Sequence, residues 1–147
     1  MENSRRDRER SGRSAETIAA RLLRLKGYRI LEQRIRLPAG EIDIVARRGR
    51  AVVFVEVKVR ATREKAAHAV QPAQRSRILR AAAQYLAGRD DLSTLVQRFD
   101  TALVVRGAWP QHIINAWSES GHSAHLAWFH LGFGPVGVTR HRCRAFE

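Results

Sequence analysis

Charged side chains interrupt two short hydrophobic runs in which an ionised group is costly to bury. Glu56 and Lys58 stand in the run VFVEVKVR. Glu41 and Asp43 stand in the preceding run GEIDIVA. An ionised group inside a sheet costs several kcal/mol unless it is paired or binds a metal ion, and carboxylates held together need a proton or a cation between them. These residue types therefore predict a site at which acids and a lysine meet.

The two runs are joined by the short polar connection RRGR and predict an antiparallel hairpin. Side chains alternate along a strand, so pairing Ala46 with Ala51 would place all four charges on one face. Asp43 and Glu56 would then be diagonal neighbours about 7 Å apart. Two carboxylates at that separation can share a hard cation such as Mg²⁺. A bulge or a three-residue loop would instead send the two sets of charges to opposite faces.

A more ordinary interpretation of the same residues is a surface ion pair. Glu56 and Lys58 would pair where their strand emerges into solvent, while Glu41 and Asp43 would lie on an exposed sheet face. A single glutamate–lysine pair would favour that interpretation. Three acids and one lysine in the most strand-like part of a strongly basic chain favour a functional site.

Other elements must hold this hairpin in place. Ser14 can cap a helix that ends at Gly27, and a second helix is expected between Pro72 and Gly88. Further strands are expected at Tyr28 to Leu37, Arg98 to Val105 and His112 to Trp117. The composition, with 44% hydrophobic residues over 147 positions, fits one domain with a real core.

The arrangement of these motifs resembles a known group of proteins. An Asp followed in the next strand by Glu-x-Lys is similar to the core motif of restriction-endonuclease-like nucleases. The segments GYRIL, GEIDIVA, VFVEVKVR, AAAQYL and RFD, within residues 12–117, are similar to the YraN family, which is grouped with Holliday-junction-resolvase-like proteins. The resemblance implies an α/β fold: a restriction-endonuclease-like core with a mixed β-sheet flanked by helices, in the order α-β-β-β-α-β-β.

The resemblance also implies roles for individual residues. Asp43 and Glu56 would be ligands of Mg²⁺ or Mn²⁺, with Glu41 close by. Lys58 would orient the attacking water and stabilise the phosphate. Glu16 matches an acid that resolvase-like proteins carry on the first helix, although a first-turn acid is equally explained by the helix dipole. Gln74 stands where the family commonly has lysine.

The charge balance indicates a polyanionic partner. Lys and Arg number 27 against 14 Asp and Glu, a net charge of +13, and most of the excess lies in residues 12–117. We expect nucleic acid, with DNA favoured over RNA because no aromatic RNA-binding motif is present. The alternative is a solvated basic surface from an arginine-rich genome. The arginines expected to follow the phosphate backbone are Arg34, Arg36, Arg47, Arg60, Arg75, Arg77 and Arg80.

Composition also limits the location and organisation of the chain. Cys143 is the single cysteine and the first 14 residues contain no apolar stretch, so we expect a cytoplasmic protein without disulfides or membrane association. Residues 1–11 are expected to be a flexible arm, residues 12–117 the nucleic-acid-binding domain, and residues 118–147 an extension.

The function that follows from these expectations is a metal-dependent endonuclease acting on DNA, with branched or recombining structures as candidate substrates. Symmetric cleavage of a junction would require a homodimer, although no residue specifies an interface. The alternative is a nucleic-acid-binding protein that has the nuclease fold without significant turnover.

Overall fold

The computed structural model describes residues 2–60, 70–105 and 107–117. Its elements are α1 (Glu2–Leu25), β1 (Arg29–Leu37), β2 (Gly40–Arg48), β3 (Ala51–Arg60), α2 (Pro72–Leu86), α3 (Asp90–Ser93), β4 (Val96–Val105) and β5 (Gln111–Trp117). The five strands form one sheet in the order β1-β2-β3-β4-β5. All neighbouring strands are antiparallel except β3 and β4, which are parallel. The α/β fold class with its mixed sheet is therefore confirmed.

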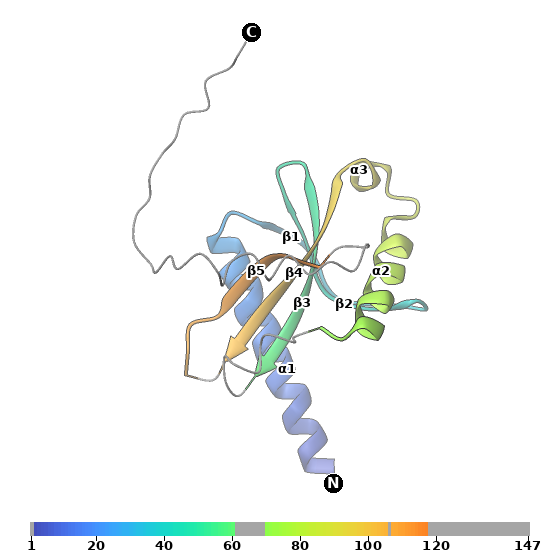
Figure 1. Ribbon diagram of the computed structural model, residues 1–147. Coiled ribbons are helices and arrows are strands. Elements are labelled where there is room, and N and C mark those ends of the chain that lie inside the picture. The colour runs from blue at the N-terminus through green and yellow to red at the C-terminus, as the bar shows by residue number, and fades with distance from the viewer. Residues whose placement is uncertain (1, 61–69, 106, 118–147) are drawn as a thin grey trace.

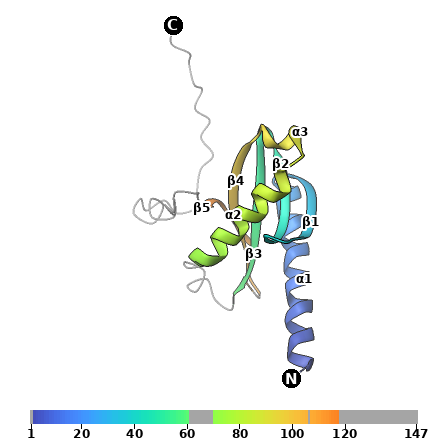
Figure 2. The same ribbon diagram turned by 90° about the vertical axis from the view of Figure 1, so that its right-hand side faces the viewer.

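The sheet is covered on both faces, and this explains why β3 reads as continuously hydrophobic. Figures 1 and 2 show α1 on one side of the sheet and α2 on the other. The core beneath α1 includes Leu23, Val53 and Val55, and the core beneath α2 includes Phe54 and Tyr85. Alternate residues of β3 thus enter opposite cores.

Two details of the helices differ from expectation. The prediction that Ser14 starts the first helix is wrong, because α1 begins at Glu2 and includes residues 2–11. Arginine and glutamate are good helix formers, and no proline occurs before Pro38 to stop the helix. The short helix α3 was not predicted, since four residues are too few to show a helical period.

The register of the hairpin also differs from the prediction. Pairing of Ala46 with Ala51 is wrong: Ala46 pairs with Val53 and Arg48 pairs with Ala51. The connection is a two-residue turn in which Gly49 has φ +57°, so both preceding arginines belong to β2. The shift of two residues moves Asp43 from opposite Phe54 to a position next to the last recorded pair, Ile44 and Val55.

Close packing of α2 on the β1–β2 turn fixes where β2 begins. Gly40 has φ +154°, and a Cβ atom there would lie 3.2 Å from the carbonyl oxygen of Arg77. Gln84 adds a side-chain acceptor for the N–H of Ala39, at 3.1 Å. Because only glycine fits this approach without strain, the start of β2, and with it Asp43, is held against the helix.

The predicted extension at residues 118–147 lies outside the described residues. Among the helices that the structure describes, none has the length and apolar character required to cross a bilayer.

Candidate active site

Asp43 lies where β2 and β3 separate. The recorded pairing of the two strands stops at Ile44 and Val55, and the Oδ2 atom of Asp43 accepts the backbone N–H of Val57 at 2.7 Å. The side chain of Asp43 thus provides an acceptor for a β3 N–H near the end of the ladder. Ile42 and Val45 enter the same core although they are three residues apart, so strict alternation fails between them. This irregularity places the carboxylate at the gap between the strands.

The environment of Asp43 disfavours its ionised form. Burial and, secondly, the nearby Glu56 carboxylate raise the pKa of Asp43 to about 7, and Glu16 acts in the same direction. The Val57 N–H and the Lys58 ammonium lower the pKa and offset only part of this effect. Two carboxylates that repel each other in a half-buried place are a common arrangement at functional sites.

Glu56 and Lys58 form an ion pair at the end of β3 nearest Asp43. The Nζ atom of Lys58 donates to Oε1 of Glu56 at 2.6 Å, and the two side chains are 15% and 8% exposed. Gln74 of α2 joins them: its Nε2 donates to Oε1 of Glu56, and its Oε1 accepts from Lys58 at 2.9 Å. The ordinary interpretation predicted an ion pair in solvent, whereas this pair is largely enclosed and lies beside Asp43.

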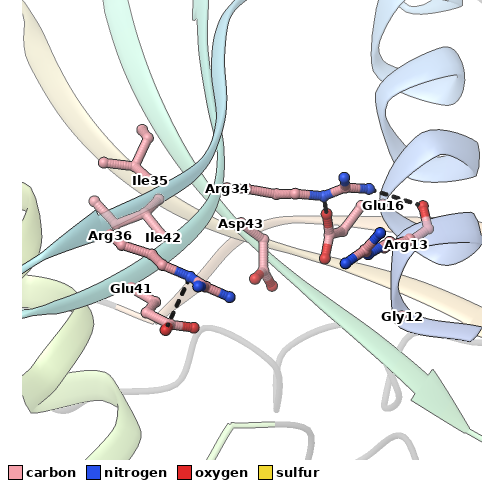
Figure 3. Close-up of a pocket in the computed structure, with 9 residues that line it drawn as sticks. All are labelled: Gly12, Arg13, Glu16, Arg34, Ile35, Arg36, Glu41, Ile42 and Asp43. Carbon is pink, nitrogen blue, oxygen red and sulfur yellow. Dashed lines mark hydrogen bonds and ion pairs between the residues drawn. The ribbon is translucent and has the colours of Figure 1, made fainter. Parts of the chain in front are cut away.

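Glu16 reaches the same region from α1 and is already paired. Its carboxylate forms an ion pair with Arg34, whose Nη2 also donates to the backbone oxygen of Arg13 at 3.3 Å. Figure 3 shows Asp43 between this pair and the pair formed by Arg36 and Glu41. Arg34 has φ +57°, an unusual conformation for a residue with a Cβ atom.

Glu41 does not converge on the other acids. Its side chain is 70% exposed and pairs with Arg36 at 3.4 Å. A cavity of about 700 Å³ lies between the two ion pairs, with Asp43 and the apolar Ile42 in its lining. This cavity is continuous with the Asp43 carboxylate and carries arginine guanidinium groups, which suit a phosphate group.

The arginines expected to bind nucleic acid are distributed over the molecule. Arg34 and Arg36 line the cavity beside Asp43, and Arg60 ends β3 two residues after Lys58. Arg47 lies at the far end of β2, where its Nε donates to the carbonyl of Gly49. On α2, Arg75 donates to the carbonyl of Val70, while Arg77 and Arg80 are exposed. The structure thus brings Arg34 and Arg36 towards Asp43 and leaves Arg47 apart.

The donor set fits a hard divalent cation at two carboxylates. Within the described residues, no hydrogen bond engages Oδ1 of Asp43 or Oε2 of Glu56, so each acid retains an oxygen for a ligand. Carboxylate oxygens are the donors that Mg²⁺ and Mn²⁺ prefer. No group of three or more His, Cys, Asp or Glu side chains in the described part of the chain is arranged as a metal site. Asp43 and Glu56 are the two acids of this site that have an oxygen left for such an ion.

A second buried charge cluster was not predicted. Asp100 of β4 is completely buried and accepts from Nε and Nη2 of Arg98 at 2.9 and 2.8 Å, and from the N–H of Asn115 at 2.8 Å. Nε2 of His112 lies 2.8 Å from the same carboxylate. Burial alone would raise the pKa of Asp100, but the hydrogen bonds from His112, Arg98 and Asn115 outweigh it and lower the pKa.

The raised pKa of Asp43 predicts how stability changes with pH. Without divalent cations, unfolded Asp43 loses its proton near pH 3.8 while folded Asp43 keeps it until about pH 7. The folded state binds more protons in this window, so the contribution of Asp43 to the unfolding free energy falls as pH rises, by at most ~4 kcal/mol. Urea unfolding should show Asp43→Asn more stable than wild type at pH 8 and similar near pH 4. Equal pH slopes for the two proteins would contradict the expected pKa.

The ion pair of Glu16 predicts a weak role in metal binding. Because its carboxylate is engaged by Arg34, Glu16→Gln should change Mn²⁺ affinity by less than about threefold, whereas Asp43→Asn should reduce it at least about tenfold. The Mn²⁺ affinities of both variants are measured from the electron paramagnetic resonance signal of free Mn²⁺. The variant Arg34→Asn complements this test, because it removes the ion pair with Glu16. Asparagine tolerates the positive φ of this position. A tenfold loss in Glu16→Gln would place Glu16 among the ligands.

The fold and the site define a class of protein. The mixed sheet with its flanking helices, and an Asp facing Glu-x-Lys where two strands part, are those of a restriction-endonuclease-like α/β protein. The model of the uncharacterised protein family UPF0102 matches residues 15–104. The chain belongs to this family, also called the YraN family, as its motifs predicted.

Bacterial relatives extend the likeness over most of the domain. A UPF0102 protein of Maricaulis maris is 52% identical over 117 residues, covering 80% of this chain and 92% of the relative. A UPF0102 protein of Parvibaculum lavamentivorans is 50% identical over 108 residues, covering 74% and 81%. One from Rhodopseudomonas palustris is 49% identical over 110 residues, covering 75% and 86%.

Proposed function

We propose that this protein is a divalent-metal-dependent nuclease that hydrolyses phosphodiester bonds in DNA. The observation that carries the proposal is the position of Asp43 at the gap between β2 and β3, beside the enclosed pair of Glu56 and Lys58. Burial and, secondly, an electrostatic conflict with Glu56 raise the pKa of Asp43, and a cation bound at the two acids would relieve that conflict. An isolated surface ion pair would not generate this conflict.

Each residue of the site has a distinct role in this reaction. Asp43 and Glu56 would hold Mg²⁺ or Mn²⁺, which when bound supplies an activated water and neutralises charge on the phosphate. Lys58 would donate to the attacking water and to a phosphate oxygen as negative charge develops. Water adds to phosphorus, one phosphorus–oxygen bond breaks, and the leaving oxygen takes a proton.

The basic character of the chain supports a nucleic-acid substrate. The net charge of +13 attracts polyanions, and Arg34 and Arg36 lie in the cavity next to Asp43. Contacts to phosphates make binding weaken steeply with salt. We favour DNA, in linear, flapped or junction form, as the substrate to be tested first.

The experiment is a cleavage screen with purified protein. Linear, flapped and junction DNA are incubated with Mg²⁺, Mn²⁺ or EDTA, and wild type is compared with Asp43→Ala and Lys58→Ala. The proposal expects metal-dependent products from wild type only. Equal residual activity in all three proteins would identify a contaminating nuclease and remove the assigned site.

Two observations favour a second function. The described residues offer two converging carboxylates rather than a group of three or more, and Lys58 is already paired with Glu56 and Gln74. A DNA-binding protein of nuclease fold without turnover would have the same appearance. It predicts salt-sensitive DNA binding that survives Asp43→Ala, with no products in any metal.

A further inference from the structure

We propose that Gln74 is a positioning residue that holds Glu56 in place and thereby leaves Lys58 free to turn towards the substrate. This inference rests on the proposed function, because it concerns the same site. Gln74 belongs to α2, across the sheet surface from β3, and no role was predicted for it. Its test is arranged so that the site and the positioning role can fail separately.

Gln74 completes a ring of hydrogen bonds with the two residues of β3. Its Nε2 donates to Oε1 of Glu56, and its Oε1 accepts from Nζ of Lys58 at 2.9 Å. Lys58 closes the ring by donating to the same Oε1 of Glu56 at 2.6 Å. Glutamine suits this position because its amide offers a donor and an acceptor at one end.

Helix packing brings Gln74 to this point. Gln74 precedes Ile78 by four residues, and Ile78, Ala82 and Tyr85 are buried against the sheet. Residues spaced by about four lie on one face of a helix, so Gln74 is a polar member of the apolar stripe of α2. The buried positions that follow it fix the helix on the sheet, and therefore hold the amide over Glu56.

The two carboxylate oxygens of Glu56 differ in the hydrogen bonds that they accept. Oε1 receives both donors, and within the described residues Oε2 receives none. Gln74 and Lys58 thus present Oε2 as the oxygen for a cation. Buried carboxylates that lose their hydrogen-bond donors are strongly destabilised. The donor from Gln74 keeps Oε1 satisfied when Lys58 leaves it.

The same geometry gives Lys58 two states. An ammonium group has three N–H donors, and in this structure Lys58 uses two of them, on Glu56 and Gln74. The third donor is left for a phosphate oxygen, and turning the ammonium fully towards a phosphate would take it away from Glu56. Since Gln74 remains on Glu56 after that rotation, Oε1 of Glu56 still has a donor.

The test uses Gln74→Met, which keeps the length of the side chain and good helix propensity but removes both amide groups. Gln71→Ala is the matched control, because Gln71 is exposed, lies three residues away, and makes no side-chain capping bond. Thermal unfolding confirms that both variants fold. Three quantities are then measured: Mn²⁺ affinity without DNA, kcat and KM for DNA cleavage, and the acylation rate of Lys58.

The expected result for Gln74→Met is a loss of about 10- to 100-fold in Mn²⁺ affinity or in kcat, the range typical of residues that orient metal ligands. KM should be nearly unchanged. Lys58 should be acylated several-fold more slowly than in wild type, relative to the exposed Lys26 in the same molecule, because it is then the remaining donor to Oε1 of Glu56. Gln71→Ala should match wild type in all three measurements.

Different outcomes overturn different claims. If wild type binds no Mn²⁺ and cuts no DNA, the proposed function fails, and the labelling of Lys58 still decides whether Gln74 holds the pair. If wild type binds Mn²⁺ while Gln74→Met equals it in affinity, kcat and Lys58 labelling, the site stands and the positioning role is overturned.

Discussion

The substitution Asp43→Asn is expected to abolish metal-dependent DNA cleavage, by at least about 10³-fold, while the folded protein becomes more stable at pH 8. Asparagine can still accept the Val57 N–H but cannot repel Glu56 or bind a hard cation as a charged ligand. Loss of activity together with a gain in stability separates a functional carboxylate from a structural one. Single-turnover cleavage and urea unfolding of the same preparation measure both effects.

Two further variants complete this experiment. Glu41→Gln is the matched control, since Glu41 lies two residues from Asp43 but is exposed and paired with Arg36. It should retain nearly full activity. Lys58→Met should lose about 10²- to 10³-fold in rate, as for removal of one electrostatic group, while it still binds Mn²⁺. An Asp43→Asn protein that cuts DNA at the wild-type rate would eliminate the proposed centre.

The substitution Asp100→Asn is expected to cause a large loss of stability without touching the candidate active site. Asp100 is completely buried and pairs with Arg98 through two nitrogen atoms. Removing one partner of a buried ion pair leaves an uncompensated charge, and we expect a cost of about 3 kcal/mol because Arg98 is partly exposed. The corresponding fall in melting temperature is roughly 10 °C for a domain of this size.

The pH dependence of this effect has a definite sign. The pKa of Asp100 is lowered in the folded state, so its stabilisation is present above the unfolded value and is lost as pH falls below about 4. Asp91→Asn is the control, because Asp91 is exposed on α3. A cost below about 0.5 kcal/mol for Asp100→Asn would show that the cluster does not hold β4 and β5 together.

The fold and the main site could be predicted from the sequence, because charged residues stand there within runs that are expected to be buried. The hydrophobic runs around Glu56 and Asp43 predicted a covered hairpin, and the charges within them marked the position that the structure brings together. The register was not accessible. The connection RRGR allows several turns. The observed register depends on a positive φ at Gly49, which leaves Arg47 and Arg48 in β2.

The residues that were missed carry the same signal in a weaker form. Asp100 interrupts the apolar strand at FDTALVV as Glu56 interrupts its own, yet its partner His112 is brought to it only by the sheet. Gln74 was noted only because it stands where the family commonly has lysine, whereas its position four residues before Ile78 also places it on the buried stripe of α2. Glu41 is the opposite case: it stands in the same hydrophobic run as Asp43, yet its side chain is exposed to solvent.

The parallel pairing of β3 with β4 has a consequence for how the chain folds. The β1–β2–β3 meander joins neighbouring segments, whereas Ala51 must find Val96 across the whole α2 segment. The chain must close this long loop before the contacts between β3 and β4 can form, and the entropy lost on closing it slows folding. Until β4 arrives, the most hydrophobic strand of the protein has an unpaired edge. Partly synthesised chains would therefore be vulnerable to aggregation, and early docking of α1 and α2 on the meander would limit that exposure.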